Sequence, residues 1–153
     1  MKKFTFTLQA VHGVREMRQE KEQLILSKLQ TEAASIAKQI QEIEDKRRVA
    51  LETYARRLEC GERFDPLEME LNARYLLSLD LLERQTRAAL AEKEQACARQ
   101  CASVAAAAQA VQATAKIRET QRARHNFEIA RTEQIALDEM VSVNYARALS
   151  QKI

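Results

Sequence analysis

Apolar residues in the first part of the chain recur at alternating steps of three and four positions. The series starts at Leu26, ends at Tyr54 and admits one charged residue, Arg47. Steps of three and four place side chains on one face of an α-helix, so the series predicts a long helix with a coiled-coil seam. The remaining seam positions are Leu29, Ala33, Ile36, Ile40, Ile43 and Ala50.

A second series with similar spacing follows in the later part of the chain. Two seams joined by a tight turn pack antiparallel, so the numbers of partner positions should add to about 126, with Ile36 beside Leu90. The fold class predicted is therefore all-α, a long two-helix antiparallel coiled-coil hairpin. The positions of the second series are Leu90, Lys93, Cys97, Cys101, Val104, Ala108, Val111 and Ala115.

The segment ECGERFDPLE separates the two series and holds the only proline and one of the two glycines. Gly61 suits the left-handed residue that follows a helix C-terminus. Asp65, Pro66 and Glu68 fit the N-cap, first and third positions of a new helix, the pattern of a capping box. The predicted elements are a helix at about 8–60, a turn at 61–65 and a helix at about 66–150, in a single hairpin of residues 1–153.

The two predicted helices differ in length, so the second overhangs the first. The first is about 80 Å long at about 1.5 Å per residue, and its pairing uses the second only to about residue 118. The remaining segment, residues 119–153, is called the tail. It still carries an apolar stripe, so we expect it to fold back, to self-associate or to bind a partner. The stripe comprises Phe127, Ala130, Leu137, Val141 and Tyr145.

A second apolar surplus lies beside the turn, in the region called the tip. Its residues spread around more of the helix than one partner helix can cover. Contiguous exposed apolar surface usually marks an interaction site, so the tip should also bind another protein. The residues concerned are Tyr75, Leu76, Leu77, Leu79, Leu81 and Leu82.

Composition and charge exclude several classes of protein. Aromatic residues make up only 5% and tryptophan is absent, which argues against a thick globular core. The net charge of +3 comes from interspersed charges, so the chain lacks the basic stripe of a nucleic-acid-binding protein. No apolar run is long enough for a membrane span, and three cysteines without a signal peptide favour a cytoplasmic protein.

Residues suited to catalysis or metal binding do not form a site in the sequence. His12 and His125 are far apart in the sequence, and Cys97 and Cys101 supply two of the four donors that zinc needs. There is no phosphate-binding loop and no nucleophile beside a base. A two-helix hairpin also offers no water-excluding pocket for acid–base chemistry. We therefore expect a protein that is not an enzyme and binds no metal and no cofactor.

The two ends of the chain carry recognisable motifs. The chain opens with FTFTLQAVHGVRE and closes with EQIALDEMVSVNYAR, which holds Leu137, Asp138, Glu139 and Arg147. In these motifs the chain resembles the FliJ family of flagellar type III export proteins. Length and the single hairpin agree with that family. The resemblance implies a coiled-coil stalk similar to the γ subunit of rotary ATPases, peripheral at the inner face of the cell membrane.

The resemblance also implies three partners and two sets of binding residues. The partners are the hexameric export ATPase, whose ring assembly the stalk promotes, the cytoplasmic domain of the membrane export gate, and export chaperones. Residues expected to contact the gate at the tip are Tyr54, Tyr75, Leu79, Leu82 and Thr86. Residues expected to contact the ATPase ring through the tail are Phe127, Leu137, Asp138, Glu139, Val141 and Tyr145.

Two other functions fit a helical hairpin. A generic holding chaperone would grip unfolded chains at its tip and bind many proteins. A plain structural scaffold would continue its heptads without an apolar surplus at the tip. Pull-down with the export ATPase distinguishes both from an export stalk.

Overall fold

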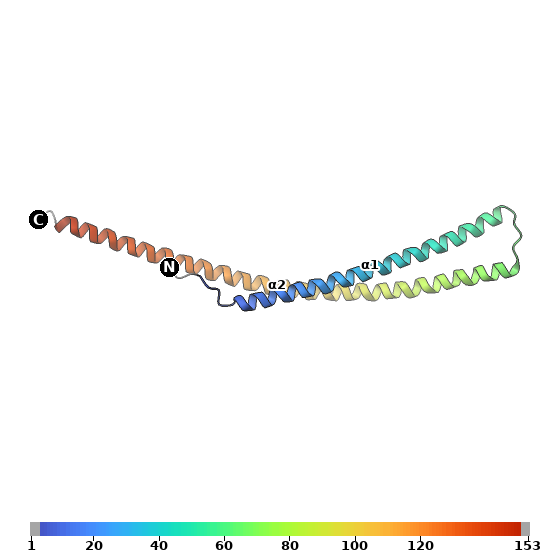
Figure 1. The fold of residues 1–153 in the computed structure, drawn as a ribbon, viewed down its shortest axis with the longest axis horizontal. Helices are drawn as coiled ribbons and strands as arrows, with labels where there is room; N and C mark the ends of the chain where they lie inside the picture. The colour runs from blue at the N-terminus through green and yellow to red at the C-terminus, as the bar shows by residue number, and fades with distance from the viewer. Residues whose placement is uncertain (1–3, 151–153) are drawn as a thin grey trace. The chain divides into compact units, whose positions relative to one another are not determined.

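A computed structural model describes residues 4–150 of the protein, with side chains described up to residue 147. Two helices, α1 (Gln9–Glu59) and α2 (Pro66–Ser150), make up almost all of this range, which contains no strand. They run antiparallel and pack against each other, which confirms the predicted all-α hairpin (Figure 1). The observed bounds agree to within one residue with the predicted ranges of about 8–60 and about 66–150.

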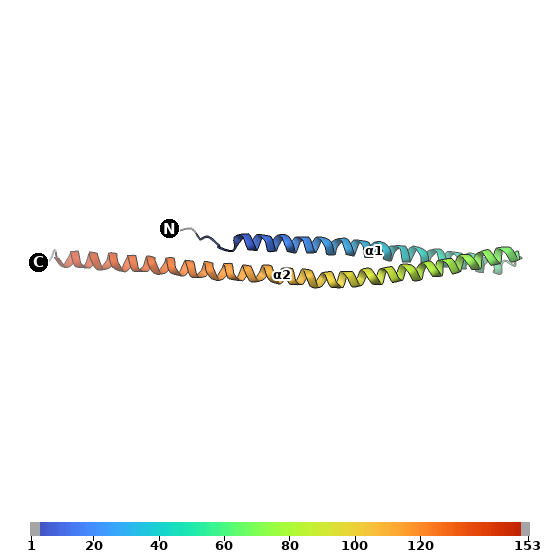
Figure 2. The ribbon, with the colours of Figure 1, turned by 90° about the horizontal axis from the view of Figure 1, so that it is seen from below.

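Contacts within the chain define two compact units. The turn unit, residues 20–106, contains most of α1, the turn and the first part of α2. The terminal unit combines the residues up to 19 with those from 107 onward. Within each unit α1 and α2 run in opposite directions, as a second view also shows (Figure 2).

The end of α1 is closed by the backbone conformation of Gly61. Its φ of 71° is left-handed, and a side chain there would be strained. The amide of Gly61 donates to the carbonyl of Leu58 at 3.0 Å, and the amide of Glu62 donates to that of Arg57 at 3.2 Å. These two bonds form a Schellman motif, which satisfies carbonyls that the helix end would leave free.

The start of α2 is capped by Asp65, as predicted. One carboxylate oxygen of Asp65 accepts a hydrogen bond from the amide of Leu67 at 3.3 Å, and Pro66 occupies the first helical position. Glu68 was expected to complete a capping box, but its carboxylate instead accepts a bond from Arg57 of α1 at 3.2 Å. Asp65 therefore supplies the capping bond of α2, while Glu68 forms an ion pair that joins α2 to α1.

The seam of the turn unit buries aliphatic side chains from both helices. Ile40 and Ile43 of α1 and Leu79 of α2 are buried. Apart from Arg47, every predicted α1 seam residue is buried or half-buried. Burial of such side chains is the main favourable term in helix pairing, so this seam supplies the core of the unit.

Polar side chains cross the same seam at its edges. Lys93 Nζ donates to a Glu32 carboxylate oxygen at 2.6 Å, and this bond raises the pKa of Lys93. The Gln100 amide donates to both the backbone carbonyl and the carboxylate of Glu22. Arg47, the charged member of the α1 series, pairs with two carboxylates of α2 at 3.2 and 3.6 Å. Partner positions follow the predicted register, since the numbers of Lys93 and Glu32 add to 125.

One part of the predicted α2 seam is wrong by a single position. The prediction placed Cys101, Ala108 and Ala115 in the seam, but Cys101 and Ala115 are exposed. Their places are taken by Gln100, Ala107 and Thr114, which are half-buried or buried. The structure keeps a strict heptad from Leu90 onward, so the seam uses the residue before each of these three, while the other five predicted positions are half-buried as expected.

The terminal unit is held by a buried polar pair. His12 Nδ1 lies 2.8 Å from Thr114 Oγ1, and both side chains are buried, Thr114 to 1% exposure. The other ring nitrogen of His12 lies 3.3 Å from a Glu16 carboxylate oxygen, and the Phe6 ring meets the imidazole edge-on. Every polar atom of this pair therefore has a partner, as burial requires.

Further contacts extend this packing toward the N-terminus. The Arg15 guanidinium donates to the backbone carbonyl of Ala110 at 2.9 Å. The segment before α1 lies alongside α2 (Figure 1). The rings of Phe4 and His125 there lie 5.6 Å apart. Beyond these contacts α2 continues without α1 beside it.

Candidate partner-binding sites

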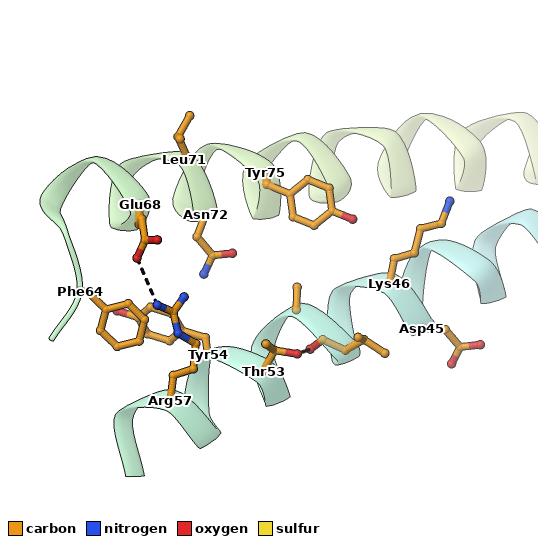
Figure 3. Close-up of a pocket in the computed structure, with 12 residues that line it drawn as sticks. Asp45, Lys46, Thr53, Tyr54, Arg57, Phe64, Glu68, Leu71, Asn72 and Tyr75 are labelled. Carbon is orange, nitrogen blue, oxygen red and sulfur yellow. Dashed lines mark hydrogen bonds and ion pairs between the residues drawn. The ribbon is translucent and has the colours of Figure 1, made fainter. Parts of the chain in front are cut away.

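A groove of about 660 Å³ opens between α1 and α2 next to the turn. We call it the tip groove. Figure 3 shows Tyr75 and Asn72 of α2 directed toward α1 across this space. The further lining residues are Asp45, Lys46, Val49, Ala50, Thr53, Tyr54, Arg57, Phe64, Glu68 and Leu71. Pockets with apolar walls and a few polar groups are the usual form of a binding site.

Aromatic rings close the end of the tip groove nearest the turn. The rings of Tyr54 and Phe64 lie 4.6 Å apart, and the Arg57 guanidinium stands 4.6 Å above the Phe64 ring. Arg57 also bonds to Glu68 at 3.2 Å (Figure 3) and to Glu62 at 2.7 Å, and these bonds raise the pKa of Arg57. This cluster holds the turn against both helices.

The charge at the other end of the tip groove is not balanced. Lys46 extends from α1 toward α2 in Figure 3 and forms no ion pair among the described residues. Asp45, its neighbour, is paired with Arg48 at 3.0 Å. The groove therefore combines an apolar wall with the Lys46 cation, which suits an apolar partner segment that carries a carboxylate.

Four of the five predicted tip residues have side chains that a partner could reach. Tyr54 and Tyr75 line the tip groove, and Tyr75 is exposed. Leu82 is 47% exposed. Thr86 is half-buried, and its hydroxyl donates to the backbone carbonyl of Leu82 at 2.7 Å.

A residue that contacts a partner at the tip should face outward, but Leu79, the fifth predicted gate residue, does not. Its side chain is 6% exposed and lies in the seam of the turn unit. The heptad that includes Asn72 and Leu90 passes through Leu79, so this residue packs on α1. A partner could reach Leu79 only by separating the helices.

The tail exposes its apolar stripe. Phe127 is 70% exposed, Val141 67% and Tyr145 68%. Leu137, the fourth predicted apolar residue, is also exposed. Exposure of this many large apolar side chains on one helix is unusual for a protein without a partner.

The two acidic residues predicted to act with this stripe are exposed as well. The Asp138 carboxylate accepts a hydrogen bond from the Gln134 amide at 3.0 Å, one turn earlier. Glu139 lies one position further along α2 and forms no ion pair among the described residues. The tail thus offers apolar and acidic groups together.

Sequence reasoning missed the residues that shape the tip groove, above all Phe64, Arg57 and Lys46. A signal for Phe64 existed, because it is an aromatic residue in a turn with few other apolar groups. Nothing in the sequence pointed to the separation of the helices that makes the groove.

Other kinds of site find little support within the described residues. No group of three or more His, Cys, Asp or Glu side chains there could hold a metal ion. The three cysteines form no disulfide. No helix in the described range is long and apolar enough to cross a membrane.

Comparison with protein-family models, with curated proteins and with solved structures finds no match to this chain.

Proposed function

We propose that the protein is a non-enzymatic component of a flagellar type III protein export apparatus. In this proposal it is a coiled-coil stalk that promotes assembly of the export ATPase ring. The stalk couples the ring to the membrane export gate and meets export chaperones. It would work in the cytoplasm, held at the inner face of the membrane by its partners alone.

The observation that supports this proposal most is the uncovered tail. A helix that carries Phe127, Val141 and Tyr145 as exposed residues needs apolar surroundings. The central opening of a protein ring would provide them on all sides. The closing motif that resembles the FliJ family includes Val141 and Tyr145, and the hairpin fold agrees with the resemblance.

The tip groove supports the second contact in the proposal. It gathers Tyr54, Phe64 and Tyr75 around a space that a side chain or a short helix of the gate could fill. Lys46 adds a cation that could pair with a carboxylate of that partner. Of the predicted gate residues, Leu79 is withdrawn because it is buried.

Truncation after Arg118 tests the role of the tail. The shortened chain keeps the pair of His12 and Thr114, so its helices should still pack. We expect it to lose stimulation of the purified export ATPase, while circular dichroism shows a helical protein. Stimulation equal to that of the full chain would refute the tail assignment.

A pair of substitutions tests the tip groove. Tyr75→Asp places a charge in the groove and should weaken binding to the cytoplasmic domain of the gate at least tenfold, because an unpaired charge is costly to desolvate. The matched control is Leu77→Asp, whose side chain lies outside the groove and the seam. Equal binding by both variants would exclude the groove as the gate contact.

An aromatic groove also suits a holding chaperone. Such a protein would bind many unfolded chains, and Tyr75→Asp would weaken all of these interactions alike. Binding of one gate domain at a single affinity, with no binding of reduced unfolded proteins, separates the export stalk from this alternative.

A further inference from the structure

The exposed stripe of the tail has the spacing of a coiled-coil seam of its own. Phe127, Gln134 and Val141 lie seven residues apart, and Ala130 and Leu137 fall three residues after the first two. These are the a and d positions of a heptad. Such spacing is expected where another helix packs, not on a face that stays in water.

This seam lies on a different face of α2 from the one that packs near α1. In the first part of the tail, Gln121, His125 and Ile129 are half-buried, and His125 contacts the ring of Phe4. Phe127, two residues after His125, is 70% exposed. The N-terminal part of the chain therefore leaves the second seam free.

The charges beside this seam favour one orientation of a second helix. Arg131 and Asp138 occupy successive e positions, and Glu133 occupies the g position between them. Neither Arg131 nor Asp138 forms an ion pair among the described residues. Residues at e and g positions decide the orientation of paired helices through the charges they bring together.

We propose that two copies of this chain associate through their tails as an antiparallel coiled coil. In an antiparallel pair e positions face e positions, so Arg131 of each copy would meet Asp138 of the other. In a parallel pair g positions face e positions, so Glu133 would meet Asp138, and like charges would repel. A second copy of the chain thus supplies both the apolar seam and the opposite charges.

The antiparallel arrangement also determines which seam residues of the two copies face each other. In an antiparallel pair each a position faces a d position, so the register that joins Arg131 to Asp138 places Ala130 opposite Val141 and Gln134 opposite Leu137. Each of these layers occurs twice because the pair is symmetric. A polar residue such as Gln134 in a seam favours one register at some cost in stability. The dimer should therefore be specific and of moderate affinity.

This inference does not depend on the proposed export function. If both hold, dimer formation and entry of the tail into a ring exclude each other, since they use the same side chains. Failure of one therefore says nothing about the other.

Light scattering after size exclusion tests the association directly. The full chain, measured at about 1 to 100 μM, should approach twice its monomer mass of 17.5 kDa. A mass of 17.5 kDa at every concentration would overturn the proposal.

Charge variants of the full chain test the orientation. Asp138→Arg should weaken the dimer about tenfold, because Arg131 of each copy then faces the new positive charge of the other copy. The double variant Arg131→Asp with Asp138→Arg should restore it. Glu139→Arg, an equal change of charge one residue away from the contact, is the control and should leave dimerisation unchanged.

A parallel dimer predicts the opposite result for the first variant. There Asp138→Arg would face Glu133 and strengthen association. Stronger or unchanged dimerisation by Asp138→Arg, or no recovery in the double variant, would therefore overturn the antiparallel arrangement.

Discussion

The turn unit and the terminal unit differ in the side chains that pack α1 against α2. The turn unit relies on aliphatic side chains such as Ile40, Ile43 and Leu79, and a capped turn links its helices covalently. The terminal unit has no such turn, and its most deeply buried side chain is Thr114, bonded to His12. The most deeply buried side chains of the turn unit are aliphatic, whereas that of the terminal unit belongs to a polar pair.

The difference concerns stability and specificity. Apolar side chains stabilise a seam but tolerate shifts of register, because one aliphatic contact resembles the next. A buried hydrogen-bonded pair adds little net free energy but makes every other register costly. Thr114 and His12 therefore specify the alignment of α1 and α2 within the terminal unit.

The largest effect should come from Leu79→Ala in the turn unit. Removing a buried leucine side chain costs about 2–4 kcal/mol through lost burial and the cavity left behind. Thermal unfolding followed by circular dichroism measures this loss. The control is Leu82→Ala, three residues later and 47% exposed, which should cost well under about 1 kcal/mol. Equal losses for the two would contradict the burial of Leu79.

A smaller effect is expected from Thr114→Val in the terminal unit. Valine keeps the shape of threonine but leaves buried His12 without a partner at Nδ1, which should cost about 1–3 kcal/mol. The control Thr120→Val removes an exposed hydroxyl that bonds only to its own helix at 2.9 Å. Adding His12→Leu to Thr114→Val should recover part of the loss, since both polar groups are then gone. A fully additive double variant would show that the pair is not coupled.

The smallest of the three effects should follow Asp65→Ala at the turn. The variant removes the cap on the Leu67 amide and should lower the free energy of unfolding by about 1 kcal/mol. Asp65→Asn retains an oxygen that can accept the bond, so it should stay close to the parent chain. If the alanine and asparagine variants unfold alike, the cap does not contribute to the stability of the turn unit.

Sequence alone predicted the helices, the turn and the register of pairing. These features depend on strong local signals: Gly61, Asp65 and Pro66 differ in kind from the residues around them. The α1 seam was also readable, because its isoleucines and leucines alternate with polar residues.

The sequence predicted seam positions less accurately where neighbouring residues are alike. In the alanine-rich part of α2, hydrophobicity hardly differs between Ala107 and Ala108, so it cannot choose between registers one residue apart. Gln100 and Thr114 enter the seam because of bonds to Glu22 and His12, which only three-dimensional contacts reveal.

The burial of Leu79 and the presence of the tip groove also could not be predicted from the local sequence. Six of the eight residues from Tyr75 to Leu82 are large and apolar, so composition did not show that Leu79 is buried in the seam. The groove depends on the helices separating near the turn, and this separation has no counterpart in the local pattern. The roles of the tip and tail residues in binding stay predictions.

The positions of the cross-helix bonds imply an order of folding. Arg57 and Glu68 are 11 residues apart in sequence, Lys93 and Glu32 are 61 apart, and His12 and Thr114 are 102 apart. Closing the longest of these loops costs about 2 kcal/mol more entropy than closing the shortest. Pairing should therefore begin at the turn and proceed like a zipper toward His12, and amide hydrogen exchange should find the opposite end fraying first.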